Sequence, residues 1–182
     1  MTSRPKRRQS GSAAVEMALV TPVLLLLLAG IIDFSRAFYE EVALSAAVAA
    51  AAEYALLNAS NVSSAGAATL AATLSGIVAN SNGSAWAGAT VVVNDGATSA
   101  VNGGSSASSG TAANADSCWC PSGSPGSVTW GEAAACGTNC EEGTLAGKFV
   151  AIDGTRAFTA IFGDYGLIGS RTLHQGTIVQ TQ

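Results

Sequence analysis

The sequence has few of the side chains on which enzymes and nucleic-acid-binding proteins depend. It contains one histidine among 182 residues, and charged residues make up 11% of the chain. None of the G-x-S-x-G, HExxH or P-loop patterns occurs, and the carboxylates are scattered rather than paired. The lone His174 is typical of a packed or exposed position rather than of a catalytic base. We therefore expect no enzymatic activity, no catalytic residue and no cofactor.

Basic residues are also scarce outside the N-terminus. Four of the eight are Arg4, Lys6, Arg7 and Arg8, whereas all twelve acidic residues lie from Glu16 onward. A nucleic-acid surface would need clustered Lys and Arg on the folded part, so no nucleic-acid partner is expected. The positive-inside rule instead places the basic leader, residues 1–11, in the cytoplasm.

Large apolar side chains are few once the N-terminal region is set aside. Hydrophobic residues make up 48% of the chain and aromatic residues 6%, but much of the hydrophobic share is alanine. A domain with this composition has a thin core. We expect one membrane anchor and one small domain in a chain of this length.

The one long apolar run lies at residues 12–32. As a helix it would span about 31 Å, which matches a hydrocarbon core of about 30 Å. We expect a transmembrane helix here, with the rest of the chain outside the cytoplasm. A signal peptide cut by ordinary signal peptidase is an alternative, but residues 28–32 lack a clean small-x-small site. A plain single-pass anchor is a second alternative.

A single carboxylate, that of Glu16, lies near the start of this apolar helix. A charged side chain at the bilayer centre costs roughly 2.5–3.5 kcal/mol on insertion scales, so such residues usually have a function. Glu16 follows Gly11 by five positions, near the positive end of the helix, where its charge is favoured. A plain anchor leaves this residue unexplained.

The helix is expected to continue beyond the membrane. Residues 33–58 are rich in alanine, the best helix former, and a polar Asn/Ser-rich break follows at residues 58–64. A second helix is predicted at residues 65–79, where Leu70 and Leu74 recur at helical spacing.

Residues 59–182 are expected to form a small extracytoplasmic domain. The β-rich stretch 89–93 ends in the turn Asn94-Asp95-Gly96. Two further strands, 147–152 and 155–162, are predicted to form a hairpin about Asp153-Gly154. A last strand is expected at 171–179.

The segment 102–117, composed mainly of Gly, Ser, Ala and Asn, is predicted to be a flexible loop. The fold class is therefore α+β: a long N-terminal helix, a helix packed beside it and a short antiparallel sheet clipped by disulfides.

Four cysteines lie close together in the segment 118–140. Their even number and expected extracytoplasmic location favour disulfides. Because a bridge between Cys118 and Cys120 would be strained, we expect two bridges to Cys136 and Cys140, either nested or crossed. A Cys₄ zinc site is the alternative, but the one-residue first spacing is unusual for zinc, and no metal is expected.

The N-terminal residues resemble a known family. The stretch Gly11-Ser-Ala-Ala-Val-Glu16, followed by an apolar helix, resembles the type IV prepilin processing site, where a prepilin peptidase cuts after the glycine. Together with Pro22, the leucine run and Ile-Ile-Asp-Phe-Ser-Arg, it is similar to the TadE-like minor pilins (pseudopilins) of the tight-adherence type IV pilus system. The similarity covers residues 4–58 strongly and 149–182 weakly, and Met17 stands where phenylalanine is usual.

This resemblance implies a pilin-like fold and a role in pilus assembly, and through it in surface attachment and biofilm formation. Gly11 and Ser12 would be the processing site. Glu16 would act in assembly, by pairing with the new α-amino group of a neighbouring subunit. The implied partners are prepilin peptidase, other pilin and pseudopilin subunits, the assembly machinery of the inner membrane, and the lipid bilayer. The implied location is the bacterial inner membrane, with a periplasmic domain, or the pilus itself.

Two other classes of protein remain open. One is a membrane-anchored extracytoplasmic binding domain unrelated to pili, with its function in the loop 118–140 and in exposed Trp119 and Trp130. That reading predicts no cleavage at Gly11. The other is a membrane-anchored enzyme or metal protein, which would show bound zinc or a thiol-dependent activity.

Overall fold

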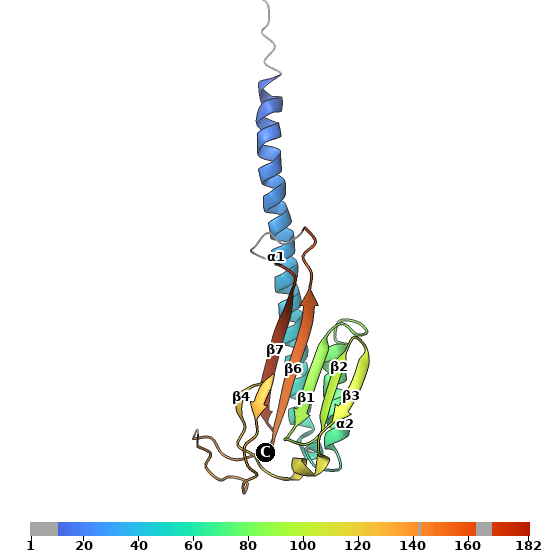
Figure 1. The fold of residues 1–182 in the computed structure, drawn as a ribbon, viewed down its shortest axis with the longest axis vertical. Helices are drawn as coiled ribbons and strands as arrows, with labels where there is room; N and C mark the ends of the chain where they lie inside the picture. Colours follow the sequence, from blue (N-terminus) through green and yellow to red (C-terminus); the bar gives the residue numbers. More distant parts are fainter. Residues whose placement is uncertain (1–10, 142, 163–168) are drawn as a thin grey trace, which may run out of the picture.

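The computed structural model of the chain describes residues 11–141, 143–162 and 169–182. A long helix carries a globular α+β part on its C-terminal half (Figure 1). The predicted fold class is therefore confirmed. Most of the basic leader, residues 1–10, lies outside the described residues, as does Glu142.

Helix α1 runs without interruption over Ser12–Leu57. Its 46 residues correspond to about 69 Å at 1.5 Å per residue. Pro22 lies inside it, which a membrane helix tolerates better than a soluble one. The prediction that the apolar helix continues to about residue 58 is confirmed.

The two halves of α1 have different surroundings. Residues 13–28 are exposed along their whole length, whereas one face is buried from Ala29 onward. The buried positions recur at helical spacing and are mostly small: Ala29, Asp33, Ala37, Leu44, Ala47, Val48, Ala51 and Ala55. The second half of α1 is thus the central support of the globular core.

Helix α2 spans Ala67–Ala79 and packs against both α1 and the sheet. Leu70, Leu74 and Val78 are at most 2% exposed, so the predicted apolar face does contact the core. Between the helices, the expected polar break contains the 3₁₀ turn η1, Ala59–Asn61.

Five antiparallel strands form the main sheet, in the order β3-β2-β1-β6-β7. Their bounds are Gly88–Val93 (β1), Thr98–Asn102 (β2), Ser105–Ser109 (β3), Phe149–Phe158 (β6) and Arg171–Gln180 (β7). Alternate residues such as Val91 and Ile152, which are register partners, point into the core and are fully buried. Helices α1 and α2 cover this face. A short hairpin, β4 (Ser122–Ser124) and β5 (Ser127–Thr129), forms a second sheet.

The predicted hairpin about Asp153-Gly154 is wrong. Both residues lie inside the single ten-residue strand β6, which pairs along its whole length with β7. Gly154 lies at a close approach of the sheet to α1, since a Cβ atom there would lie 3.0 Å from Val48 and 3.1 Å from Leu44. The glycine is therefore needed for helix–strand contact, and not for a turn.

The prediction of a flexible loop at residues 102–117 is also wrong. The segment completes β2, turns at Gly103 and Gly104 with φ angles of 55° and 82°, and continues as β3. The 3₁₀ turn η2, Ala112–Asp116, follows. All five residues of β3 are exposed, so the sequence shows no apolar alternation by which a strand could be recognised.

The contact at Gly154 yields a stability prediction. Gly154→Val should destabilise the fold by about 1–3 kcal/mol, because the added methyl groups overpack the α1–β6 contact. Gly76→Ala, in helix α2, is the matched control. Its Cβ would meet nothing within 4 Å, so it should stabilise the helix by roughly 0.5–1 kcal/mol. Urea unfolding in detergent checks both values. Equal stability of Gly154→Val and the wild type would contradict the close contact.

Candidate functional site

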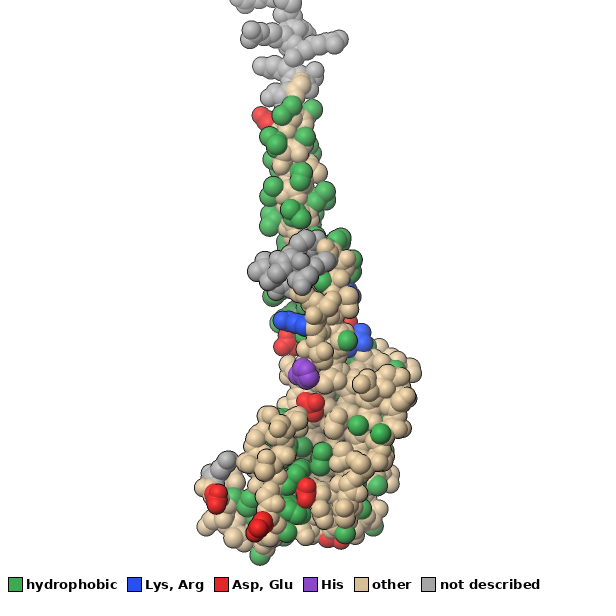
Figure 2. All heavy atoms as spheres, viewed as in Figure 1, with side chains coloured by type: hydrophobic (Ala, Val, Ile, Leu, Met, Phe, Trp, Pro, Cys, Tyr) green, Lys and Arg blue, Asp and Glu red, His purple; other side chains and the backbone are tan. Residues whose placement is uncertain are grey.

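The N-terminal half of α1 is an apolar rod that makes little contact with the globular part. The helix is long and apolar enough to cross a membrane, and 6% of its most apolar 18-residue window is buried. The core helix of a soluble protein would be mostly buried. Figure 2 shows hydrophobic side chains along this part, with an acidic side chain near its far end. The helix is therefore a candidate single-pass membrane anchor.

The predicted processing and assembly residues lie at the tip of this rod. Gly11 is the residue immediately before the helix, and its carbonyl oxygen accepts a hydrogen bond from the Val15 N–H at 3.4 Å. The next residue, Ser12, is the first of the helix. Glu16 is exposed, one turn further along. The three residues are thus adjacent and far from the globular core, and their roles stay predictions.

Where α1 meets the globular part, it carries a buried carboxylate, that of Asp33. Asp33 is 2% exposed. Its Oδ1 accepts a hydrogen bond from the Ile161 N–H at 2.8 Å, and its Oδ2 accepts one from the Phe162 N–H at 3.1 Å. Arg36 adds a positive charge 3.9 Å away. Asp33 therefore ties the chain after β6 to the helix.

One signal in the sequence could have identified Asp33. It lies four residues after Ala29 and four before Ala37, on the same helix face as these two buried alanines. A carboxylate on a buried face must accept hydrogen bonds to offset its desolvation, whereas one on the opposite face would only contact water.

A second ionic contact between helix and sheet lies farther along α1. Arg156 on β6 donates from Nε to Glu40 at 3.0 Å and from Nη1 to the carbonyl oxygen of Trp86. Its guanidinium group also lies 5.2 Å from the centre of the Trp86 ring. Because both charged side chains are half-buried, this pair contributes more to the α1–β6 contact than an exposed pair would.

The cysteines form two crossed disulfides, Cys118–Cys136 and Cys120–Cys140, with Cα–Cα distances of 5.2 and 5.7 Å. The prediction of two bridges between the pairs is confirmed, and the structure assigns the crossed alternative. With all four sulfur atoms in bridges, the zinc alternative has no thiolate ligands. Within the described ranges, no group of three or more His, Cys, Asp or Glu side chains could hold a metal.

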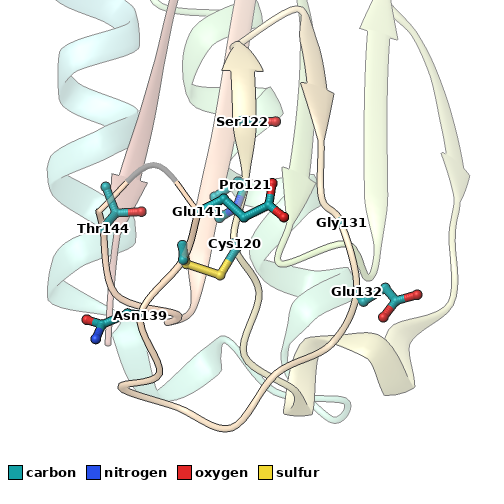
Figure 3. Close-up of a pocket in the computed structure, with 9 residues that line it drawn as sticks. Cys120, Pro121, Ser122, Gly131, Glu132, Asn139, Glu141 and Thr144 are labelled. Atoms are coloured by element: carbon teal, nitrogen blue, oxygen red, sulfur yellow. A yellow bond between two sulfur atoms is a disulfide. The ribbon is translucent and has the colours of Figure 1, made fainter.

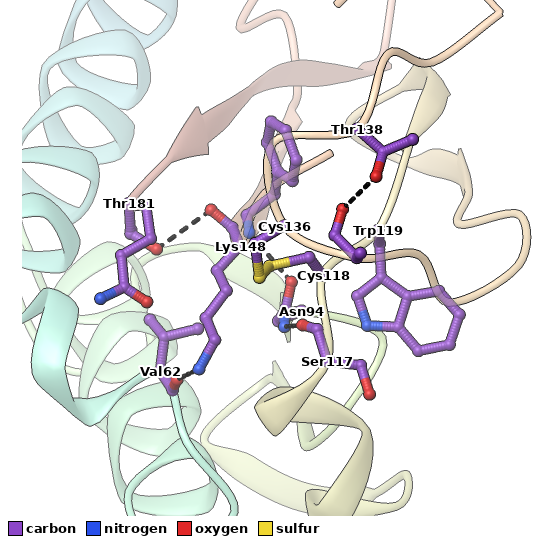
Figure 4. Close-up of a disulfide and its surroundings, with 12 residues drawn as sticks. Val62, Asn94, Ser117, Cys118, Trp119, Cys136, Thr138, Lys148 and Thr181 are labelled. Carbon is purple, nitrogen blue, oxygen red and sulfur yellow. Dashed lines mark hydrogen bonds between the residues drawn. A yellow bond between two sulfur atoms is a disulfide. The ribbon is translucent and has the colours of Figure 1, made fainter. Parts of the chain in front are cut away.

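The first disulfide is anchored to the sheet by Asn94, which is fully buried (Figure 4). Its side chain donates to the carbonyl oxygens of Ala115 and Ser117, and its Oδ1 accepts from the Phe149 N–H. The residue has a φ of 54°, a conformation that asparagine tolerates well. The predicted turn at residues 94–96 is therefore also the attachment point of the disulfide segment.

The expectation that Trp119 is exposed is wrong, because Trp119 is 8% exposed and its Nε1 donates to the Asn114 carbonyl oxygen. Trp130 is half-buried. Beside the second disulfide lies an open hollow of about 420 Å³, which includes Glu132 and Glu141 in its lining. Figure 3 shows these two carboxylates well apart. The hollow thus brings together no acid–base pair from its described lining.

Two carboxyl groups of the globular part have shifted pKa values. Burial raises the pKa of Asp153, which lies on the outer face of β6 beneath the β4–β5 hairpin, and the nearby His174 lowers it in part. Hydrogen bonds from Ser64 lower the pKa of exposed Asp116, whose Oδ1 accepts the Ser64 N–H at 2.8 Å. The folded structure therefore disfavours the charged form of Asp153 and favours the charged form of Asp116.

Comparison with protein families decides the affiliation of the helix. Residues 11–53 match the family model described as TadE-like protein. This segment is TadE-like. The predicted resemblance is confirmed over the part of the chain that contains Gly11, Glu16 and Asp33. Comparisons with curated proteins and with solved structures found no match.

Asp33 in the TadE-like segment leads to a prediction about local opening. Asp33→Ala removes the acceptor of two amide hydrogen bonds, and bonds to a charged group contribute about 1.5–3 kcal/mol each. The amides of Ile161 and Phe162 should then exchange at least about ten-fold faster, as measured by hydrogen exchange in detergent. Glu41→Ala is the control, because Glu41 is an exposed acid of the same helix. Unchanged exchange at both amides in Asp33→Ala would contradict this role.

The two shifted carboxyl groups give a pH dependence of opposite sign. The native state binds the Asp153 proton more tightly than the unfolded chain, so Asp153 lowers stability as pH rises through its raised pKa. Asp153→Asn should therefore stabilise the fold near neutral pH, and the gain should vanish below about pH 4. Asp116 contributes stability above its unfolded pKa, which is lost as pH falls, so Asp116→Asn should destabilise near neutral pH. Thermal unfolding of both variants across pH tests these two predictions. Changes in Tm of the same sign near neutral pH would refute the opposite roles of Asp153 and Asp116.

Proposed function

We propose that this protein is a minor pilin, or pseudopilin, that acts in the assembly of a tight-adherence type IV pilus and so supports surface attachment and biofilm formation. Its role is structural and non-catalytic. The observation that carries the proposal is the exposed apolar half of α1. This half is TadE-like, begins directly after Gly11, and bears a single carboxylate one turn on.

Processing gives that carboxylate a partner. Cleavage after Gly11 by a prepilin peptidase leaves the α-amino group of Ser12 as a positive charge at the start of the helix. Glu16 lies four positions on, at a spacing that brings side chains to one helix face. In a bundle of such helices, Glu16 of one subunit pairs with the amino group of the next. The pairing lowers the cost of both charges in the membrane.

The proposed location follows from the same elements. The leader faces the cytoplasm and α1 crosses the inner membrane. The globular part lies in the periplasm, where an oxidising environment allows the two disulfides to form and persist. The proposed partners are prepilin peptidase, other pilin and pseudopilin subunits, the assembly machinery of the inner membrane, and the lipid bilayer.

Processing and assembly can be tested separately with one pair of variants. With a co-expressed prepilin peptidase, mass spectrometry of the membrane-extracted protein should find a chain that begins at Ser12. Glu16→Ala should be cut and inserted like the wild type, but it should recover far less of the other pilin subunits in pull-downs, because the amino group has lost its partner. Met17→Ala, the neighbouring position on the exposed rod, should recover the wild-type amount.

The contrary results have distinct meanings. An intact Met1 or Thr2 terminus, with and without the peptidase, would reject processing at Gly11 and favour an anchored extracytoplasmic binding domain unrelated to pili. Normal cleavage with unchanged recovery of subunits by Glu16→Ala would retain the processing site but reject the assembly role of Glu16.

A further inference from the structure

Four large apolar side chains are exposed near the end of the apolar run of α1, residues 12–32. Phe34 and Phe38 belong to the helix and are 63% and 61% exposed. Ile161 and Phe162 belong to the chain after β6 and are 60% and 44% exposed. We call these four residues the junction patch. Exposed apolar groups that gather at one level of a molecule usually mark a contact surface.

Asp33 determines where Ile161 and Phe162 lie along the axis of α1. Because its carboxylate accepts the backbone N–H groups of both Ile161 and Phe162, these residues lie beside the turn of α1 that follows Ile32. The two side chains are therefore held at the end of the apolar run, and not at the distal end of the globular part. The helix part of the patch continues the exposed apolar surface of the rod, because Ile31, which is 60% exposed, precedes Phe34 by three positions and Phe38 by seven.

Two arginines lie near Phe158, the last residue of β6, after which the chain continues to Ile161 and Phe162. The guanidinium of Arg36 lies 5.7 Å from the centre of the Phe158 ring, and Arg171 is exposed on β7 opposite Phe158 in the register. In Figure 2, basic side chains, with acidic side chains beside them, appear between the apolar rod and the bulk of the globular part. Apolar and aromatic groups bordered by arginines are typical of the headgroup level of a bilayer.

The positions of these residues along the helix axis agree with a location in the headgroup layer. Arg36 and Phe38 lie about 6 and 9 Å beyond Ile32 along the helix axis. The headgroup layer on each side of the hydrocarbon core is roughly 5–8 Å thick, from the total and core thicknesses of a bilayer. With residues 12–32 across the core, Ile161 and Phe162 are held by Asp33 at the boundary between acyl chains and headgroups, and Phe38 lies at the outer edge of the headgroup layer.

We propose that the junction patch is a membrane-docking surface, with which the base of the globular part inserts into the interfacial layer of the lipid bilayer. The proposal rests on the membrane-spanning helix of the proposed function. Ile161 and Phe162 contact the lipid, and Asp33 holds them at the required depth. The bilayer is the occupant, because the helix part of the patch continues the surface of the span, and Arg36 lies one turn of α1 beyond Ile32.

Fluorescence of added tryptophans in full-length protein tests the docking surface. Phe162→Trp and Ile161→Trp each place a reporter in the patch. Leu145→Trp, at a 51% exposed position in the disulfide segment, is the matched control, and Leu24→Trp reports on the span itself. The native Trp86, Trp119 and Trp130 are common to all variants. The vesicles are phosphatidylcholine with acyl chains brominated either near the headgroup, to quench the reporters at 161 and 162, or near the chain ends, to quench Leu24→Trp close to the bilayer centre. Unbrominated lipid is the reference.

The added emission of Phe162→Trp and Ile161→Trp should be lost in brominated vesicles, while that of Leu145→Trp is kept. Unquenched reporters at 161 and 162 beside a quenched Leu24→Trp would overturn the docking surface and leave the membrane span intact. If Leu24→Trp also stayed unquenched, the span of the proposed function would fail with it. A blue shift at 162 without quenching, growing with protein density, would show that a second copy covers the patch, and would equally overturn the proposal.

Discussion

The close contact between helix α1 and strand β6 is the constraint on which the rest of the structure depends. Gly154 lets Leu44 and Val48 approach the strand backbone, and the small residues of the same helix face allow the sheet to pack along the length of the helix. A core poor in large side chains gains cohesion through such close packing, since dispersion contacts fall off steeply with distance. The globular part is therefore built around the second half of the same helix whose first half is apolar and exposed.

Polar contacts then fix the position of the sheet along α1. Asp33 accepts two amide hydrogen bonds from the chain after β6, and Glu40 pairs with Arg156 two turns further on. Each is a directional contact to one atom or group, unlike the alanine packing, which several registers could satisfy. The disulfide segment is joined to the far end of the sheet through Asn94. The position of the sheet along the helix is thus fixed by the directional contacts of Asp33 and Glu40.

Features of the fold that depend on composition or periodicity could be predicted from the sequence. The long helix, the face of α2, strand β7 and the presence of two disulfides all carry such a signal, as does the TadE-like segment, whereas the crossed pairing of the cysteines does not. The errors arose where a residue serves a distant contact. Asp153-Gly154 has the local form of a turn, but Gly154 is required by α1, and the exposed strand β3 has no apolar pattern at all. The helix-face position of Asp33 marks it as buried, but its partners are backbone amides 128 and 129 positions away, and helical spacing cannot identify them.

The central claim is that one continuous helix joins the exposed apolar rod to the core. Hydrogen exchange along α1, in full-length protein reconstituted into lipid nanodiscs, tests this claim most directly. The account predicts unbroken protection of the backbone amides from the apolar run through Asp33 and Arg36 to Ala55, since every one of these amides lies within a single helix. Rapid exchange confined to the residues between Gly30 and Phe38, with protection on both sides, would reveal a hinge and contradict it.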